Sequence, residues 1–98
     1  NGEQALASSE HIQHAVAEFF SMSVDDLLSA KRTSDLALAR QIAMFLCRKL
    51  TEVSLQQIGL SFRKKDHTTV LHAHRKISQM VKEQPRIRQI VDTIEGKL

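Results

Sequence analysis

The sequence predicts an all-α fold, a compact bundle of about six helices in one domain. The 98 residues contain three glycines and one proline, and so few chain-breaking residues favour helices joined by short connections. Apolar residues recur three and four positions apart through most of the chain, which is the period of an amphipathic helix. A chain of this length supports one modest core, so we expect residues 1–98 to form a single domain.

The first two helices are predicted from apolar stripes that follow serine caps. A stripe over residues 9–20 predicts the first helix, with Ser8 or Ser9 as its N-cap. Ser23 caps a short second helix. Residues 30–34 (AKRTS) have no apolar period, so we expect them to form an exposed basic loop.

The third helix is predicted over residues 35–51, beginning at Ser34 or Asp35. Its buried stripe is expected to comprise Ala39, Ile42, Ala43, Leu46 and Leu50. Met44 and Phe45 lie off this stripe, and the helix is basic. It therefore also suits contact with acidic phospholipids or with a protein.

The last three helices are predicted from caps and a proline. A fourth helix over residues 54–62 opens with the capping-box pattern S-x-x-Q. The fifth helix, over residues 66–83, takes Asp66 as its N-cap. Pro85 is placed as the first residue of the last helix, which ends near Glu95.

Charge is distributed unevenly along the chain. Residues 1–30 carry five acidic side chains and no Lys or Arg, whereas residues 31–76 carry ten basic and three acidic ones. This asymmetry indicates a nucleic acid or another acidic surface as the partner. The longest apolar run, residues 42–47, is far shorter than a membrane span, and we see no secretion signal. Cys47 has no second cysteine to pair with, so we expect a cytoplasmic protein.

The fifth helix is expected to turn a polar face to solvent. At 100° per residue, its core side gathers Val70, Ala73, His74, Ile77 and Val81. The opposite side gathers Thr68, His72, Arg75 and Gln79, with Leu71 at its margin. Together with the short helix before it, this is the layout of a helix-turn-helix, whose second helix enters the major groove of DNA.

The side chains at the start of the fifth helix suit contacts with bases. Asp66 can accept a hydrogen bond from cytosine N4, Thr68 and Leu71 can pack on a thymine methyl, and His67 suits both kinds of contact. Arg32, in the exposed loop, suits a narrow A·T-rich minor groove. Contacts to phosphates are expected from Arg40, Gln41, Arg48, Lys64, Lys65 and Arg75. The residues alone therefore predict a domain that binds double-stranded DNA.

The stretch DHTTVLHAHRKI, preceded by IGLSF, resembles the signature of the C-terminal DNA-binding domain of the bacterial replication initiator DnaA. The similarity continues through ARQIAMFLCRKLTEVSLQQIG, LLSAKRT and IQHAVAEFF, and it covers about residues 9–80. It implies a helix-turn-helix that reads the DnaA box, a short asymmetric site in the replication origin of the bacterial nucleoid. It also implies that an ATPase domain lies upstream, joined by residues 1–8 as a flexible connector.

The resemblance further implies a domain that needs no cofactor and hydrolyses nothing, because ATP belongs to the upstream domain. In agreement, Gly59 stands alone between residues 3 and 95, so no stretch resembles a phosphate-binding Walker loop. The isolated domain is expected to be monomeric, and the parent protein to oligomerise at the origin.

By position, the resemblance assigns base contacts to Arg32, Asp66, His67, Thr68, Leu71, Leu55 and Gln56. It assigns phosphate contacts to Arg40, Gln41, Arg48 and Thr69. The chain departs from the family where Arg63 and Lys64 replace two glycines and where Ala39 and Gln56 replace prolines. One residue of the Arg63-Lys64 pair is then expected to adopt a backbone conformation that glycine favours.

Three other functions fit the sequence less well than DNA-box binding. A transcriptional regulator with a helix-turn-helix would dimerise and read a palindrome. A metal site built from His67, His72, His74 and Cys47 lacks zinc-type spacing, so we expect no metal. Cys47 lies within an apolar run and is expected to pack in the core, not to act as a nucleophile.

Overall fold

The computed structural model describes residues 8–63 and 66–98. Apart from Ser8, the predicted connector therefore lies outside the described residues, as do Lys64 and Lys65. The helices are α1 (Ser9–Phe19), α2 (Val24–Leu28), α3 (Ser34–Leu50), α4 (Leu55–Ser61), α5 (His67–Glu83) and α6 (Pro85–Gly96). No strand occurs in these two described ranges. The all-α prediction with about six helices is confirmed.

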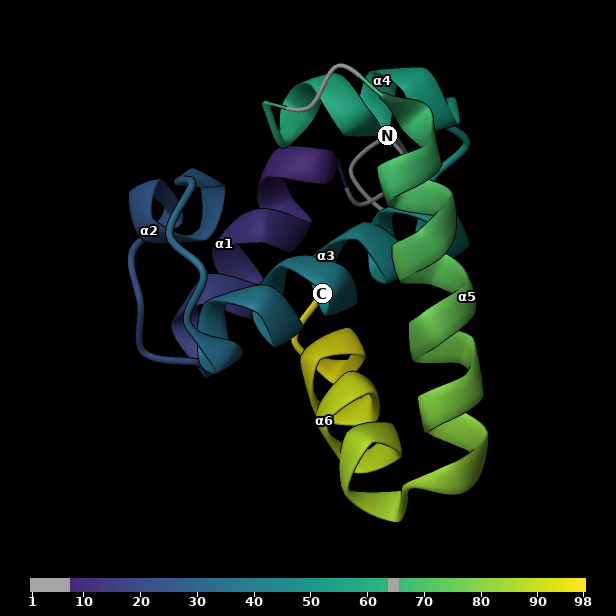
Figure 1. Cartoon of the computed structure of the whole chain (residues 1–98). Coiled ribbons are helices and arrows are strands. Elements are labelled where there is room, and N and C mark those ends of the chain that lie inside the picture. The colour runs from purple at the N-terminus through teal and green to yellow at the C-terminus, as the bar shows by residue number, and fades with distance from the viewer. Residues whose placement is uncertain (1–7, 64–65) are drawn as a thin grey trace, which may run out of the picture.

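The helices pack around α3, which crosses the middle of the molecule (Figure 1). Helix α5 runs down one side and contacts both α3 and α4, while α6 turns back from its lower end. Helix α1 packs on the opposite side of α3, with α2 beside it. The fully buried side chains of the core include Ile12, Val16, Leu27, Ile42, Leu46, Ile58, Val70, Ile77 and Ile94. The described residues contain no helix that combines the length and the apolar character needed to cross a membrane.

Polar side chains cap the beginnings of the helices, mostly where the sequence predicted. The hydroxyls of Ser8, Ser23 and Ser54 each accept a hydrogen bond from the backbone N–H three residues later. The carboxylate of Asp66 caps α5 by accepting from the N–H two residues later, and Pro85 is the first residue of α6. Each such bond satisfies an N–H that has no partner inside its own helix.

The interpretation of Met44 and Phe45 as lying off the core was wrong. Both side chains are buried, at 2% and 7% exposure, because α3 is covered on most of its circumference by its neighbours. Phe45 stacks against His74 of α5, with 5.3 Å between the ring centroids. Residues 42–47, in the middle of this helix, are all buried, whereas a single predicted stripe buries one side only.

Within the described ranges, two residues other than glycine adopt left-handed backbone conformations, both just after a helix. Ser21 follows α1 with φ of 55°, and Arg63 follows α4 with φ of 62°. After α1, the N–H of Met22 bonds to the carbonyl of Ala17 at 2.9 Å, which closes a Schellman motif. The expectation for the Arg63-Lys64 pair, drawn from the family resemblance, is thus confirmed at Arg63.

Glycine at these two positions is expected to stabilise the fold. Arg63→Gly and Ser21→Gly should each raise the free energy of unfolding by about 0.5–1 kcal/mol, because relief of left-handed strain exceeds the entropy that glycine adds to the unfolded chain. Urea denaturation followed by circular dichroism would measure the change. Gln79→Gly, in the exposed middle of α5, is the control and should lose about 1 kcal/mol. A loss of that size for Arg63→Gly would contradict a left-handed turn.

Candidate nucleic-acid interface

Helices α4 and α5 form the predicted helix-turn-helix. On the inner side of α4, Ile58 and the C-capping residue Phe62 pack into the core, and both are at most 1% exposed. Val70, Ala73 and Ile77 do the same for α5. The outer side of α5 is left to polar side chains, as the predicted helical wheel requires.

A buried glutamine of α1 fixes the position of α4. Gln13 is 3% exposed, and its side-chain amide donates a 2.9 Å hydrogen bond to the carbonyl of Ser61, in the last turn of α4. This carbonyl belongs to the group that a helix end leaves without an internal partner. The bond therefore ties the first helix of the pair to the body of the domain, a role that sequence reasoning missed because Gln13 looks like an ordinary polar position.

Replacing Gln13 with alanine should lower the free energy of unfolding by about 1–3 kcal/mol, because the Ser61 carbonyl then loses its partner in a region shielded from water. Thermal denaturation of the variant would show the loss. Gln89→Ala, at an exposed position of α6, is a matched control and should stay within about 0.5 kcal/mol of the unchanged chain. Equal stability of the two variants would show that the buried amide contributes nothing.

The first turn of α5 presents its polar side chains to solvent. Asp66, His67 and Thr68 are exposed, whereas Thr69 and Leu71 are half-buried. Asp66 Oδ1 accepts a 2.9 Å hydrogen bond from the N–H of Thr68. That bond, with a smaller contribution from the Thr68 side chain, lowers the pKa of Asp66, so its carboxylate is charged at neutral pH.

A groove with polar side chains along it lies between α3 and α5. It has a volume of about 470 Å³, with Met44 and Ala73 among the residues that line it. Its polar side chains are Arg40 and Gln41 from α3 and Thr69, His72 and Lys76 from α5. The structure thus brings together three of the predicted phosphate contacts. It adds His72 and Lys76, which the predicted contacts did not include, although their spacing from Thr69 places them along one side of the helix.

Arg40 has a second set of contacts, at the end of α2. Its Nε donates to the carbonyl of Leu27 at 2.6 Å. Its Nη2 lies 3.4 Å from both the carbonyl of Asp26 and the hydroxyl of Ser29. A guanidinium carries five N–H donors in a planar fork, so one side chain can serve the α2 end and the groove together.

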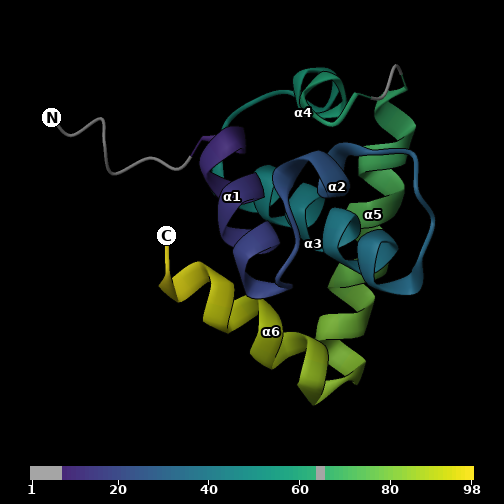
Figure 2. The same cartoon turned by 90° about the vertical axis from the view of Figure 1, so that its left-hand side faces the viewer.

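Arg32 lies in the loop between α2 and α3 and is exposed, as predicted. In Figure 2 this loop and the N-terminal end of α5 both reach the right-hand side of the molecule. The groove connects them, because Arg40 lines it and also bonds the end of α2 from which the loop continues. Loop, groove and helix end therefore form one surface.

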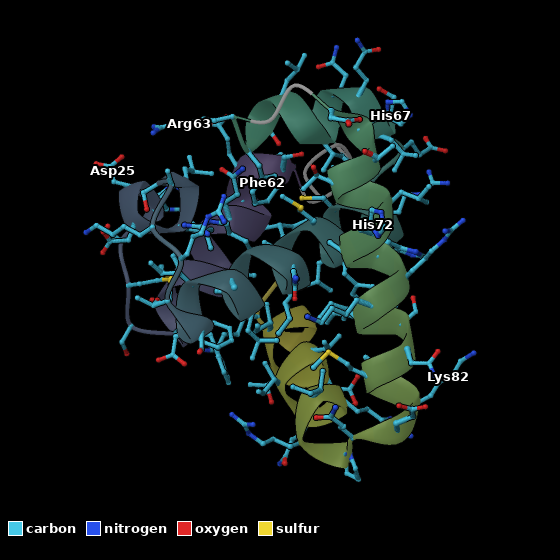
Figure 3. All side chains as sticks on the ribbon, viewed as in Figure 1. Asp25, Phe62, Arg63, His67, His72 and Lys82 are labelled. Carbon is cyan, nitrogen blue, oxygen red and sulfur yellow. The ribbon has the colours of Figure 1, made fainter. Side chains whose placement is uncertain are left out.

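The remaining predicted contacts lie around this surface or elsewhere on α3 to α5. Gln56, at the beginning of α4, is exposed, and Leu55 beside it is half-buried. Arg48 and Arg75 are exposed on α3 and α5. Burial, and to a lesser degree the charge of Arg48, lowers the pKa of His74, which is half-buried as predicted. Figure 3 shows His67 at the N-terminal end of α5 and His72 farther along the helix.

Cys47 and the histidines form no reactive centre in the described part of the chain. Burial raises the pKa of the Cys47 thiol to about 11, so the nucleophilic thiolate is scarce at neutral pH. Within residues 8–63 and 66–98, no three His, Cys, Asp or Glu side chains gather as a metal site would require.

Comparison with known proteins agrees with this architecture. The sequence pattern of the bacterial dnaA protein helix-turn-helix matches residues 9–77. The chain is 45% identical over 97 residues to the chromosomal replication initiator protein DnaA of Cutibacterium acnes (strain DSM 16379 / KPA171202), covering 99% of this chain and 19% of that protein. It is 44% identical over 89 residues to the same initiator of Streptococcus equi subsp. zooepidemicus (strain MGCS10565), covering 91% and 20%.

A crystal structure of a DNA replication initiation factor superposes with a TM-score of 0.80 at 38% identity, over 91% of this chain and 27% of that one. The chain spans about a fifth of the length of the two curated relatives, 19% and 20%. The family match covers well over half of the chain, and the resemblance stated from the sequence is confirmed. The chain belongs to the bacterial DnaA protein helix-turn-helix family.

Proposed function

We propose that the chain binds double-stranded DNA with the surface formed by the Arg32 loop, the α3–α5 groove and the N-terminal end of α5. The observation that carries this proposal is the exposed first turn of α5, where His67 and Thr68 project beside Asp66, the residue that caps the helix. A helix end of this kind is what a helix-turn-helix inserts into the major groove. The relatives are chromosomal replication initiators, and we place this chain in the same process.

The order of the parts on the surface matches the order of features on DNA. Major and minor grooves alternate along the duplex, and a phosphate backbone separates them. With α5 in the major groove and Arg32 in the adjacent minor groove, the backbone between them meets the α3–α5 groove. There Arg40, Gln41 and Thr69 supply donors, while Lys76 adds a positive charge. Arg48 and Arg75 extend the phosphate contacts, and so would Lys64 and Lys65, which lie outside the described residues.

Sequence preference comes from the remaining side chains in this proposal. In the major groove the base readers are Asp66, His67, Thr68 and Leu71, with Leu55 and Gln56 approaching from the start of α4. Arg32 favours an A·T-rich minor groove. Because one copy carries both kinds of reading side chain, a monomer suffices for a short asymmetric site such as a DnaA box. A dimer that reads a palindrome is not needed.

An acidic phospholipid surface is the less favoured partner. That alternative depended on Met44 and Phe45 projecting from the basic helix, and both are buried. An interfacial helix needs an apolar face to insert between lipids. The basic side chains of α3 remain, and phosphate contact alone accounts for them.

A fluorescence-anisotropy titration at physiological salt tests the proposal. A DnaA-box duplex should bind at least about a hundredfold more tightly than a scrambled duplex of equal composition, a difference of about 2.7 kcal/mol. The affinity should fall steeply with added salt, because each neutralised phosphate releases counterions. Equal, salt-sensitive binding to both duplexes would overturn the proposed reading role and leave a general polyanion surface.

A further inference from the structure

The loop that carries Arg32 is held to the domain at its two ends. At the far end, the hydroxyl of Thr33 accepts a hydrogen bond from the N–H of Leu36 at 3.3 Å and so caps α3. At the near end the loop leaves α2, a helix of five residues. A helix this short is not stable alone and needs partners from elsewhere in the fold.

Arg40 supplies such a partner from α3. Its Nε bonds to the carbonyl of Leu27, which the end of α2 leaves without an internal partner. Its Nη2 approaches the carbonyl of Asp26, which also accepts a hydrogen bond from the N–H of Ser29 at 3.1 Å. The hydroxyl of Ser29 in turn donates to the Asp26 carbonyl at 2.7 Å and accepts from the N–H of Lys31 at 3.3 Å. A continuous set of hydrogen bonds thus leads from Arg40 to the residue directly before Arg32.

We propose that Arg40 is a positioning residue for Arg32. By fixing the end of α2, it sets where the loop places the Arg32 guanidinium, and so it governs reading of the minor groove. Arg40 would then act on sequence preference without touching a base. This inference depends on the proposed function for its effect on DNA, but not for its effect on the loop.

The two tasks of Arg40 can be separated by lysine. The contacts with α2 use Nε and Nη2, and Nη1 has no hydrogen-bond partner among the described residues, which leaves it for a phosphate in the groove. Lysine has the same charge but a single nitrogen, so it cannot reproduce a forked contact. Arg40→Lys should therefore keep much of the phosphate attraction and lose the hold on the loop.

Two measurements on the whole chain test the inference: the first follows the loop without DNA, and the second follows sequence preference. Amide hydrogen exchange without DNA compares the unchanged chain with Arg40→Lys. Exchange at residues 29–33 should become faster in the variant and stay unchanged in the first turns of α5. Arg86→Lys, at an exposed position of α6, is the matched control and should leave both regions unchanged. Unchanged exchange at residues 29–33 in Arg40→Lys would overturn the positioning role, whatever the DNA result.

Titrations then use two duplexes that differ at the A·T-rich end of the box, where one carries G·C pairs instead. Arg32→Ala should lose about tenfold in preference for the A·T duplex. Arg40→Lys should lose most of the same preference, with the salt dependence of binding little changed, and the double variant should lose no more than Arg32→Ala.

If Arg40→Lys weakens binding to both duplexes equally, Arg40 is a phosphate contact alone, and the inference is overturned. If the unchanged chain does not prefer the A·T duplex, the proposed role of Arg32 fails, and the exchange data still decide the role of Arg40.

Discussion

Replacing His67 with alanine is expected to reduce the preference for a DnaA-box duplex over a scrambled duplex about five- to 150-fold. His67 is exposed in the first turn of α5, where a major-groove reader places its base contacts. A contact with a base edge is made in full with the cognate sequence alone, so its loss lowers cognate affinity and leaves nonspecific affinity nearly as before. Anisotropy titrations of both duplexes at one salt concentration would give the ratio.

His14→Ala is the control for this substitution, because His14 is an exposed histidine of α1, outside the proposed surface. It should keep the preference of the unchanged chain. Equal loss of affinity for both duplexes in His67→Ala would make His67 a phosphate contact. The base-reading role would then pass to other side chains of the same turn.

The largest loss of stability is expected for Phe62→Ala, at about 3–5 kcal/mol. Phe62 ends α4, is 1% exposed and points into the interior in Figure 3. Alanine there leaves a cavity that neighbouring side chains fill in part. Because folded domains are stable by about 5–15 kcal/mol, this loss would remove a large part of the stability of so small a chain. Urea denaturation at 25 °C, followed by circular dichroism, would measure the loss.

Two variants bracket this result. Phe62→Leu keeps most of the buried volume and should lose clearly less. Leu60→Ala removes a neighbouring apolar side chain that is 55% exposed, and it should change stability by less than about 0.5 kcal/mol. A similar small change in Phe62→Ala would contradict the burial of this ring. DNA affinity of the folded fraction should remain that of the unchanged chain, because Phe62 does not belong to the proposed surface.

Much of the fold was predictable because its signals are local. The caps at Ser23, Ser54 and Asp66 bond to N–H groups two or three residues away, so the sequence alone contains both partners. The burial of Met44 and Phe45 depends on helices distant in the sequence, and a helical wheel of α3 by itself does not contain that information.

The candidate site likewise combines local features, which the sequence predicts, with contacts between distant residues, which it does not. The exposed first turn of α5 follows from its own wheel and was predicted. The contact of Gln13 with Ser61 spans 48 positions, and that of Arg40 with Leu27 spans 13. Such contacts are set by how helices pack, not by residue spacing along the chain. Arg40 therefore looked like a plain phosphate contact in the sequence, and the structure adds its bonds to α2.

The conformation of Arg63 has a consequence for finding relatives of this chain. Its φ of 62° lies in the left-handed region that glycine favours, reached here by a residue with a long charged side chain. A search pattern that demands glycine before the Asp-His pair would pass over this chain, although the backbone at Arg63 adopts a conformation typical of glycine. A left-handed turn at this point therefore does not require glycine, and in this chain it places a positive charge just after α4.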